Sequence, residues 1–245
     1  TAHVTEQLLN SGAAVFLDEA TLQLESGSPL RTELEFAQQE LKRRGVTLDP
    51  ELEGNLELVL GRVADNTKIE ALEHYQKSWH HWQRAGNPLG CGHVLFYLGF
   101  WWRYYAMMHR GEKWEACQNA RNYYRECLEQ LDAADRPDLV AKFINALGEV
   151  LLYLEEWDEL EAIANRALDL HRQQSNAFRE ARAHHFLAEV ELARNNWKPA
   201  GEIIQKALDM LREQFSQYHW FVSAEDVRRL DWEKSYHWGW YLLCL

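Results

Sequence analysis

The histidines of this chain are the first candidates for chemistry, because imidazole groups bind metal ions and transfer protons near neutral pH. His74, His80 and His81 lie within eight residues, and His184 and His185 are adjacent. Two metal ligands on one helix face are usually four residues apart, with a carboxylate nearby. None of these spacings is four, so we interpret the histidines as structural or surface residues and expect no metal site. A metal-dependent helical hydrolase using His74, His81 or His184 is a minor alternative.

Motifs for catalysis and nucleotide binding are missing from the sequence. It contains no GxxxxGK, no GxGxxG and no GxSxG pattern, which would cradle phosphates or present a nucleophilic serine. The adjacent acids Glu155 and Glu156 fall in a predicted turn, where water solvates them. No nucleophile and base can be paired from the sequence. We therefore expect a protein that is not an enzyme and needs no cofactor.

Composition limits the partners of the chain. Its 245 residues are 47% hydrophobic, which is enough for a buried core, and its formal net charge is −12. Such a charge repels nucleic acid and anionic membranes. The four cysteines form no CxxC pair and are typical of reduced intracellular thiols. We expect a cytoplasmic protein with no nucleic-acid or membrane partner.

The spacing of apolar residues is helical throughout. Ile69, Leu72, Tyr75 and Trp79 illustrate the recurrence at intervals of three and four that marks one face of a helix. Turn signals separate such segments, and no alternating run long enough for a strand is found. The sequence predicts an all-α chain of antiparallel helix pairs.

Two segments forty residues apart have the same pattern of large and small residues. A fixed period of this length indicates stacked repeats, which expose an extended binding face. Two less regular copies precede them, one around Trp114 and one around Leu60 and Gly61. The members of the two clear copies are Leu147, Gly148, Leu151, Trp157, Leu160, Ala164, Ala167 and Leu168, and then Leu187, Ala188, Glu191, Trp197, Ala200, Ile204, Ala207 and Leu208.

The repeat pattern also predicts which residues are buried. Small residues such as Gly148, Ala167, Ala188 and Ala207 would let helices approach closely. A leucine in place of Gly148 should therefore destabilise the fold. Bulky residues would fill the space beyond, so we expect four tryptophans in the core: Trp79, Trp114, Trp157 and Trp197.

This pattern resembles the tetratricopeptide repeat. The resemblance implies helix pairs stacked into a right-handed superhelix that binds proteins or peptides. Arg172 and Arg212 replace the proline that usually ends the second helix, and the units are longer than the usual 34 residues. Both departures resemble the long-repeat sensor arrays of STAND/NB-ARC NTPases and maltose-regulator-type proteins. By that analogy, the chain is the sensor or interaction module of a larger signalling protein.

Three regions are expected along the chain: N-terminal helices at 1–48, about four repeats at 49–214, and a helical C-terminal segment at 215–245. The sequence ends on an apolar run without a polar cap, which suggests a fragment of a longer protein or a bound partner. Trp238 and Trp240 lie close to this end, and aromatic residues dominate binding hot spots. Self-association through the aromatic end is therefore a further expectation.

The resemblance places a concave groove on the first helix of each pair. Such a groove would grip a peptide by hydrogen bonds, charge and stacking. A carboxylate clamp of the chaperone-binding type is not expected, because Phe186 occupies one of its basic positions. Reversing the charges of Lys142 and Arg182 should spare folding and weaken binding of an acidic partner. The groove positions are Trp102, His109, Arg110, Lys142, Asn145, Glu149, Tyr153, Arg182, His185 and Glu189.

An alternative function belongs to a different class. Aromatic residues cluster between 101 and 109, and an aromatic pocket with a few polar groups is typical of a small-ligand site. The chain would then be a ligand-sensing regulatory domain. The residues of this predicted pocket are Trp101, Trp102, Tyr104, Tyr105 and His109.

Overall fold

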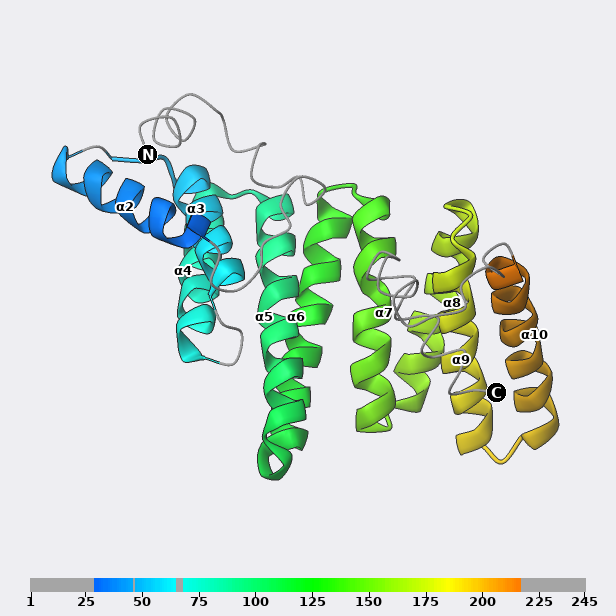
Figure 1. Cartoon of the computed structure of the whole chain (residues 1–245). Helices are drawn as coiled ribbons and strands as arrows, with labels where there is room; N and C mark the ends of the chain where they lie inside the picture. The colour runs from blue at the N-terminus through cyan, green and yellow to red at the C-terminus, as the bar shows by residue number, and fades with distance from the viewer. Residues whose placement is uncertain (1–28, 46, 65–67, 217–245) are drawn as a thin grey trace. The chain divides into compact units, whose positions relative to one another are not determined.

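A computed structural model describes residues 29–45, 47–64 and 68–216 (Figure 1). These residues form helices and no strand, so the predicted all-α fold is confirmed. The predicted contact surface around Trp238 and Trp240 lies outside the described residues. The helices are α2 (Pro29–Arg43), α3 (Pro50–Val63), α4 (Ile69–Ala85), α5 (Pro88–Met108), the short 3-10 helix η3 (Arg110–Glu112), α6 (Lys113–Ala133), α7 (Pro137–Leu154), α8 (Trp157–Gln173), α9 (Ala177–Ala193) and α10 (Trp197–Ser216).

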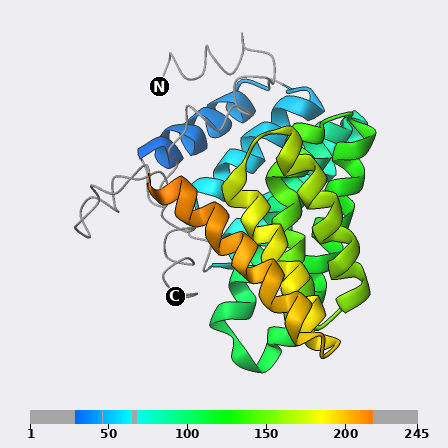
Figure 2. The same ribbon diagram turned by 90° about the vertical axis from the view of Figure 1, so that its right-hand side faces the viewer.

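The chain divides into two compact units, residues 1–136 and 137–245. In the first unit, α3 packs on α4 and α5 packs on α6, and α2 contacts α3. In the second unit, α7 packs on α8 and α9 on α10. Helices α9 and α10 run side by side in two perpendicular views (Figures 1 and 2). The helices thus form adjacent pairs, as the repeat pattern predicts, whereas the right-handed superhelix remains a prediction.

Proline and a capping side chain begin two helices of the first unit. The Asp49 side chain accepts a hydrogen bond from the backbone N–H of Leu52 at 3.0 Å, ahead of Pro50. The Asn87 side chain accepts one from Gly90 at 3.1 Å, ahead of Pro88. Each cap satisfies an otherwise unpaired N–H, and proline has none to lose at this position.

The turns that follow α6, α7, α8 and α9 recur every twenty residues. Asp135, Glu155, Ser175 and Asn195 all have φ between 52° and 62°, the left-handed conformation that ends many helices. At each turn, the next residue donates its N–H to the carbonyl five positions earlier, as Asn176 does to His171 at 2.9 Å. The four helices from α6 to α9 therefore end in the same way, which fixes the length of each repeat.

Buried rings pack against glycines on neighbouring helices. A Cβ atom added to Gly61 would lie 2.5 Å from the Tyr75 ring, and one on Gly99 would lie 2.7 Å from Tyr124. One on Gly148 would lie 2.5 Å from Phe186 of α9. These distances are far below a normal van der Waals contact, so each glycine makes room for a ring. The predicted role of Gly148 is therefore confirmed, with the partner ring coming from the next pair.

The prediction that four tryptophans are buried core residues is wrong, because Trp79 and Trp157 are only half-buried and the other two are exposed. Trp114 is 53% exposed and Trp197 is 68% exposed. Trp197 is the first residue of α10 and Trp114 the second of α6. Helical side chains point back towards the N-terminus, so these two extend beyond the packed part of their helices. The small residues Ala167, Ala188 and Ala207, by contrast, are completely buried as predicted.

We predict that Gly148→Leu destabilises the protein by at least about 1–3 kcal/mol, the usual cost of overpacking a core. The new side chain must displace Phe186, which is fully buried. Gly201→Leu is the matched control, because nothing lies within 4 Å of its added Cβ. Urea denaturation of both variants measures the difference. An unfolding midpoint equal to that of wild type for Gly148→Leu would show that the ring contact is wrongly placed.

The left-handed turns generate a second prediction. Ser175→Gly should stabilise the protein by about 0.5–1 kcal/mol, because a non-glycine residue in this conformation costs about 1–2 kcal/mol and glycine loses part of that gain through chain entropy. Gln174→Gly is the control, since its φ of −90° gives glycine no advantage. It should destabilise by about 0.5–1 kcal/mol. Thermal unfolding measures both variants. Melting temperatures lowered equally in Ser175→Gly and Gln174→Gly would contradict the left-handed conformation at Ser175.

Candidate functional site on helices α7 and α9

Helices α7 and α9 are the first helices of their pairs and contact each other. Candidate residues on each helix are three or four positions apart, so each set lies on one helix face. We call this surface the α7–α9 face. It consists of Lys142, Asn145, Glu149 and Tyr153 on α7 and Arg182, His185 and Glu189 on α9.

An ion pair joins the two helices at the centre of the α7–α9 face. Arg182 Nη2 lies 3.4 Å from Glu149 Oε1, and the guanidinium carbon lies 4.9 Å from the centroid of the Phe186 ring. Arg182 is only 9% exposed. A glutamate here would bring two carboxylates together in a poorly solvated place. We therefore expect charge reversal at Arg182 to destabilise the fold instead of sparing it.

Asn145 is part of the packing between helices. Its Nδ2 donates to the Arg179 carbonyl at 3.4 Å, and its Oδ1 lies 3.3 Å from His171 Nε2. Arg179 Nη1 in turn donates to the Ala141 carbonyl at 3.3 Å. Asn145 thus links α7 to α8 and α9. Arg179 was not predicted from the sequence, although its position one turn before Arg182 places it on the same side of α9.

His185 is a neutral member of the face. Burial, followed by the positive charge of Arg182, lowers the pKa of His185 to about 4. Its Nε2 lies 3.8 Å from Glu189 Oε1. The charged groups of the face are therefore two cations, Lys142 and Arg182, and two carboxylates. This balance suits a hydrogen-bonded partner of mixed charge better than a strongly acidic one.

Lys142 and Tyr153 lie at opposite ends of the α7 row. Lys142 is half-buried, with Nζ 5.5 Å from the centroid of the Phe143 ring. Tyr153 is 38% exposed, although it is a large aromatic residue. An aromatic side chain and a cation about eleven residues apart on a helix are separated by about 16 Å. The face can therefore contact a segment several residues long.

The other three predicted groove residues belong to the first unit. Trp102 is half-buried in an aromatic cluster, with its ring 5.7 Å from that of Tyr105. His109 and Arg110 are exposed and follow the end of α5 at Met108, so they are not on the helix that the resemblance assigned to them. The His109 ring lies 3.9 Å from the Tyr105 ring. Their membership of a groove remains a prediction.

Three of the five residues predicted to form an aromatic pocket, Trp101, Trp102 and Tyr105, line a cleft. A cleft of about 420 Å³ lies elsewhere, against α2 and α3, whereas a cleft of about 200 Å³ adjoins the aromatic cluster. Tyr104 and His109, which were predicted to line the pocket, are absent from the lining. The two glutamates of the lining, Glu112 and Glu115, were not predicted from the sequence, because they follow a turn of unpredictable shape. The lining residues are Ile69, Leu72, Trp101, Trp102, Tyr105, Glu112, Glu115 and Ala116.

Two histidines of α4 form pairs with carboxylates of α3. His74 Nδ1 lies 2.7 Å from Glu57 Oε2, and His81 Nδ1 lies 2.9 Å from Glu53 Oε2. Burial raises the pKa of Glu57, but hydrogen bonding and charge from His74 outweigh it and hold the pKa below its usual value. Over the described ranges, no three such ligands converge in a metal-binding group. These histidines connect two helices.

The described cysteines are poor nucleophiles. Cys91, Cys117 and Cys127 are buried free thiols, and burial raises the pKa of each. A reactive cysteine needs the opposite shift, because the thiolate is the nucleophile. These three side chains therefore serve as core residues.

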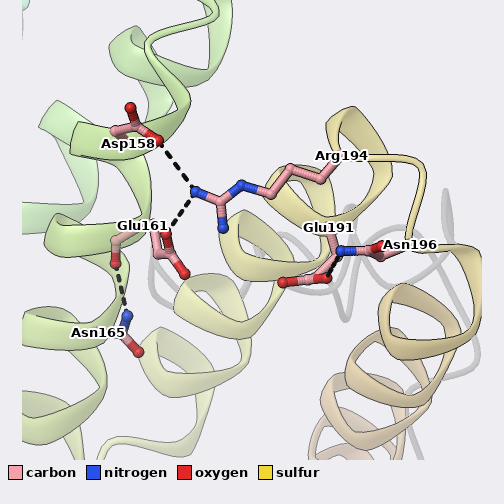
Figure 3. A network of polar contacts seen from close by, with 6 residues as sticks. All are labelled: Asp158, Glu161, Asn165, Glu191, Arg194 and Asn196. Carbon is pink, nitrogen blue, oxygen red and sulfur yellow. Dashed lines mark hydrogen bonds and ion pairs between the residues drawn. The ribbon is translucent and has the colours of Figure 1, made fainter.

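A polar network connects α8 to the turn between α9 and α10. Figure 3 shows Arg194 reaching from this turn towards two carboxylates of α8. Its Nη2 lies 2.7 Å from Glu161 Oε2 and 3.2 Å from Asp158 Oδ1, and the first contact holds the pKa of Glu161 below its usual value. Nearby, Asn196 donates to Glu191 at 2.8 Å. Such exposed contacts add little stability, so we interpret the network as setting how neighbouring pairs align.

Comparison with known proteins agrees with this geometry. The molecule is an all-α protein of stacked helix pairs, and residues 138–213 match the family model of the tetratricopeptide repeat. The predicted resemblance is therefore confirmed for α7 to α10. BtubC (BKLC) from P. vanneervenii has a similar fold, with 20% sequence identity, a TM-score of 0.60, and coverage of 78% of this chain and 76% of that one. No curated protein matches the chain.

Membrane insertion through a helix has no support in the described part of the chain. None of the helices there combines the length and apolar character that a transmembrane span requires.

Buried histidines predict a pH dependence of stability. Burial lowers the pKa of both His184 and His185 to about 4, whereas the ordinary value is about 6.5. Between these values the unfolded chain binds more protons, so the free energy of unfolding falls as the pH falls from 7 towards 4. We expect a loss on the order of 2 kcal/mol per histidine at pH 5.

Urea denaturation at pH 7 and pH 5 measures this loss. In His184→Leu the difference between the two pH values should shrink, because one buried histidine is gone. His80→Gln on the exposed side of α4 is the control and removes a histidine that is not buried. An undiminished pH difference in His184→Leu would contradict the assignment.

Proposed function

We propose that this protein is a non-catalytic scaffold that recognises a protein or peptide through the α7–α9 face. Tetratricopeptide repeats generally mediate protein–protein interactions. The observation that carries the proposal is the Tyr153 side chain, a large ring that is 38% exposed on the same helix face as Lys142 and Glu149. Exposed aromatic residues beside fixed charges are typical of interface hot spots.

The arrangement of charges suggests how a partner is held. The Arg182–Glu149 pair is already formed at 3.4 Å, so a partner need not supply a charge for it. Lys142 offers an ammonium group at one end, and Tyr153 offers an aromatic surface and a hydroxyl at the other. We infer a partner segment that places a carboxylate or carbonyl near Lys142 and an apolar side chain against Tyr153.

The scaffold would belong to a larger signalling protein in the cytoplasm. The long repeat of about forty residues supports this proposal by analogy with sensor arrays attached to NTPases. In that setting, partner binding at the repeats would control the activity of a separate domain.

The test uses peptides selected from a random displayed library against the full chain. The double variant Lys142→Glu/Tyr153→Ala should bind the selected peptides at least tenfold more weakly, because it removes both ends of the contact. Lys198→Glu/Trp197→Ala is the matched control. It makes the same charge reversal and removes an exposed ring on α10. Fluorescence anisotropy gives both affinities.

The outcome separates two binding surfaces. The control should keep its affinity within about twofold. Unchanged binding by Lys142→Glu/Tyr153→Ala, with a loss in the control, would move the binding surface to α10 and refute the proposal.

A second candidate function is sensing of a small ligand by the first unit. The observation that favours it is the cleft of about 200 Å³ beside the aromatic cluster. Calorimetric titration of the full chain with metabolites and with peptides would separate the two candidates. A heat of binding that is seen with metabolites but not with peptides, and that is lost in Trp102→Leu, would favour small-ligand sensing.

A further inference from the structure

We propose that the cleft between α4, α5 and α6 binds a small alkylammonium ion. This inference gives a ligand class to the second candidate function and is independent of the α7–α9 face. Its basis is an aromatic wall beside two carboxylates.

The aromatic wall is built from three rings in mutual contact. Trp101 stacks on Tyr105 with centroids 5.3 Å apart and planes 22° apart, and Trp102 stands at 89° to Trp101. The Trp101 ring is fixed, because its Nε1 donates to the Lys68 carbonyl at 3.2 Å and only 3% of the residue is exposed. Aromatic faces carry negative charge density and attract cations. Trp102 and Tyr105 are only half-buried, so their rings are accessible to a ligand.

Two carboxylates complete the cleft. Tyr105 donates its hydroxyl hydrogen to Glu112 Oε2 at 2.8 Å, which fixes both side chains. Glu115 lies one turn further along the chain, near the start of α6, where the helix dipole favours a negative charge. No lysine or arginine belongs to the lining of the cleft. The cleft is therefore negative as well as aromatic.

Size and polarity select the ligand further. A volume of about 200 Å³ holds a small organic ion but excludes a nucleotide or a folded partner. Ile69, Leu72 and Ala116 supply apolar contacts for methyl groups. Metal ions lack a suitable ligand set here, since metal-binding clusters are absent from the described residues. A methylated ammonium ion matches the small volume, the apolar contacts and the negative charge of the cleft, because its positive charge is spread over an apolar surface.

The test titrates the full chain with choline and with 3,3-dimethyl-1-butanol, which has the same shape without the charge. The indole N–H signals of ¹⁵N-labelled tryptophan report binding at constant ionic strength. Choline should bind at least tenfold more tightly than the alcohol. A second arm uses N-acetyl-trimethyllysine amide, which distinguishes a free metabolite from a side chain of a partner.

Two variants locate the site. Glu115→Gln should weaken choline binding at least threefold and Trp102→Leu at least tenfold. Glu129→Gln on the same helix and Trp114→Leu are the matched controls and should change little. Glu115 is exposed, so its replacement does not endanger the fold.

The outcomes are distinct. Equal binding of choline and the alcohol would overturn the cation preference while leaving a small-ligand pocket in place. No saturable binding of any probe would refute this inference, whereas the second candidate function would still stand or fall on the calorimetric titration with metabolites. Choline binding that is unchanged in Glu115→Gln and Trp102→Leu would place the site elsewhere and overturn the proposal.

Discussion

Close contact between glycines and buried aromatic rings is the constraint on which this structure depends. Tyr75, Tyr124 and Phe186 are at most 1% exposed, and each occupies space that a side chain on a facing glycine would fill. Dense packing of this kind leaves little room for adjustment. The Gly148–Phe186 contact has a further consequence, because it brings α7 against α9. The candidate binding face exists only because these two helices lie next to each other.

The sequence predicted the helix pairs because their signals are local. Pro50 after Asp49 and Pro88 after Asn87 mark helix starts, and the forty-residue period reveals α7 to α10 directly. The prediction of burial failed at Trp114 and Trp197, because their positions at the start of a helix decide their exposure more than their hydrophobicity does. Prediction from the sequence also failed at the end of α5, since no local signal fixes where the chain leaves the helix near His109. Turns without proline or glycine, such as the one at Glu155, have a left-handed residue that the sequence alone does not reveal.

The site was predicted less completely than the fold. The seven residues of the α7–α9 face follow from helical spacing, but their roles depend on partners across helices. Arg182 was expected to be an open groove cation, whereas it is 9% exposed and contacts Glu149. Asn145 was expected to face a ligand, yet its amide bonds to the Arg179 carbonyl. Contacts of this kind, between residues far apart in the sequence, produce no periodic pattern in the sequence from which they could be predicted. Tyr153, which is 38% exposed, is the residue of the face that we propose a partner contacts.

The two candidate sites follow different physical principles. The α7–α9 face is broad, balanced in charge and matched to a chain segment, whereas the aromatic cleft is small and negative. The most direct test of peptide binding at the α7–α9 face is the structure of the full chain bound to its tightest selected peptide. We predict that the peptide lies along α7 and α9 and contacts Tyr153 and Lys142. A peptide bound only to α8 and α10, with Tyr153 exposed to solvent, would contradict it.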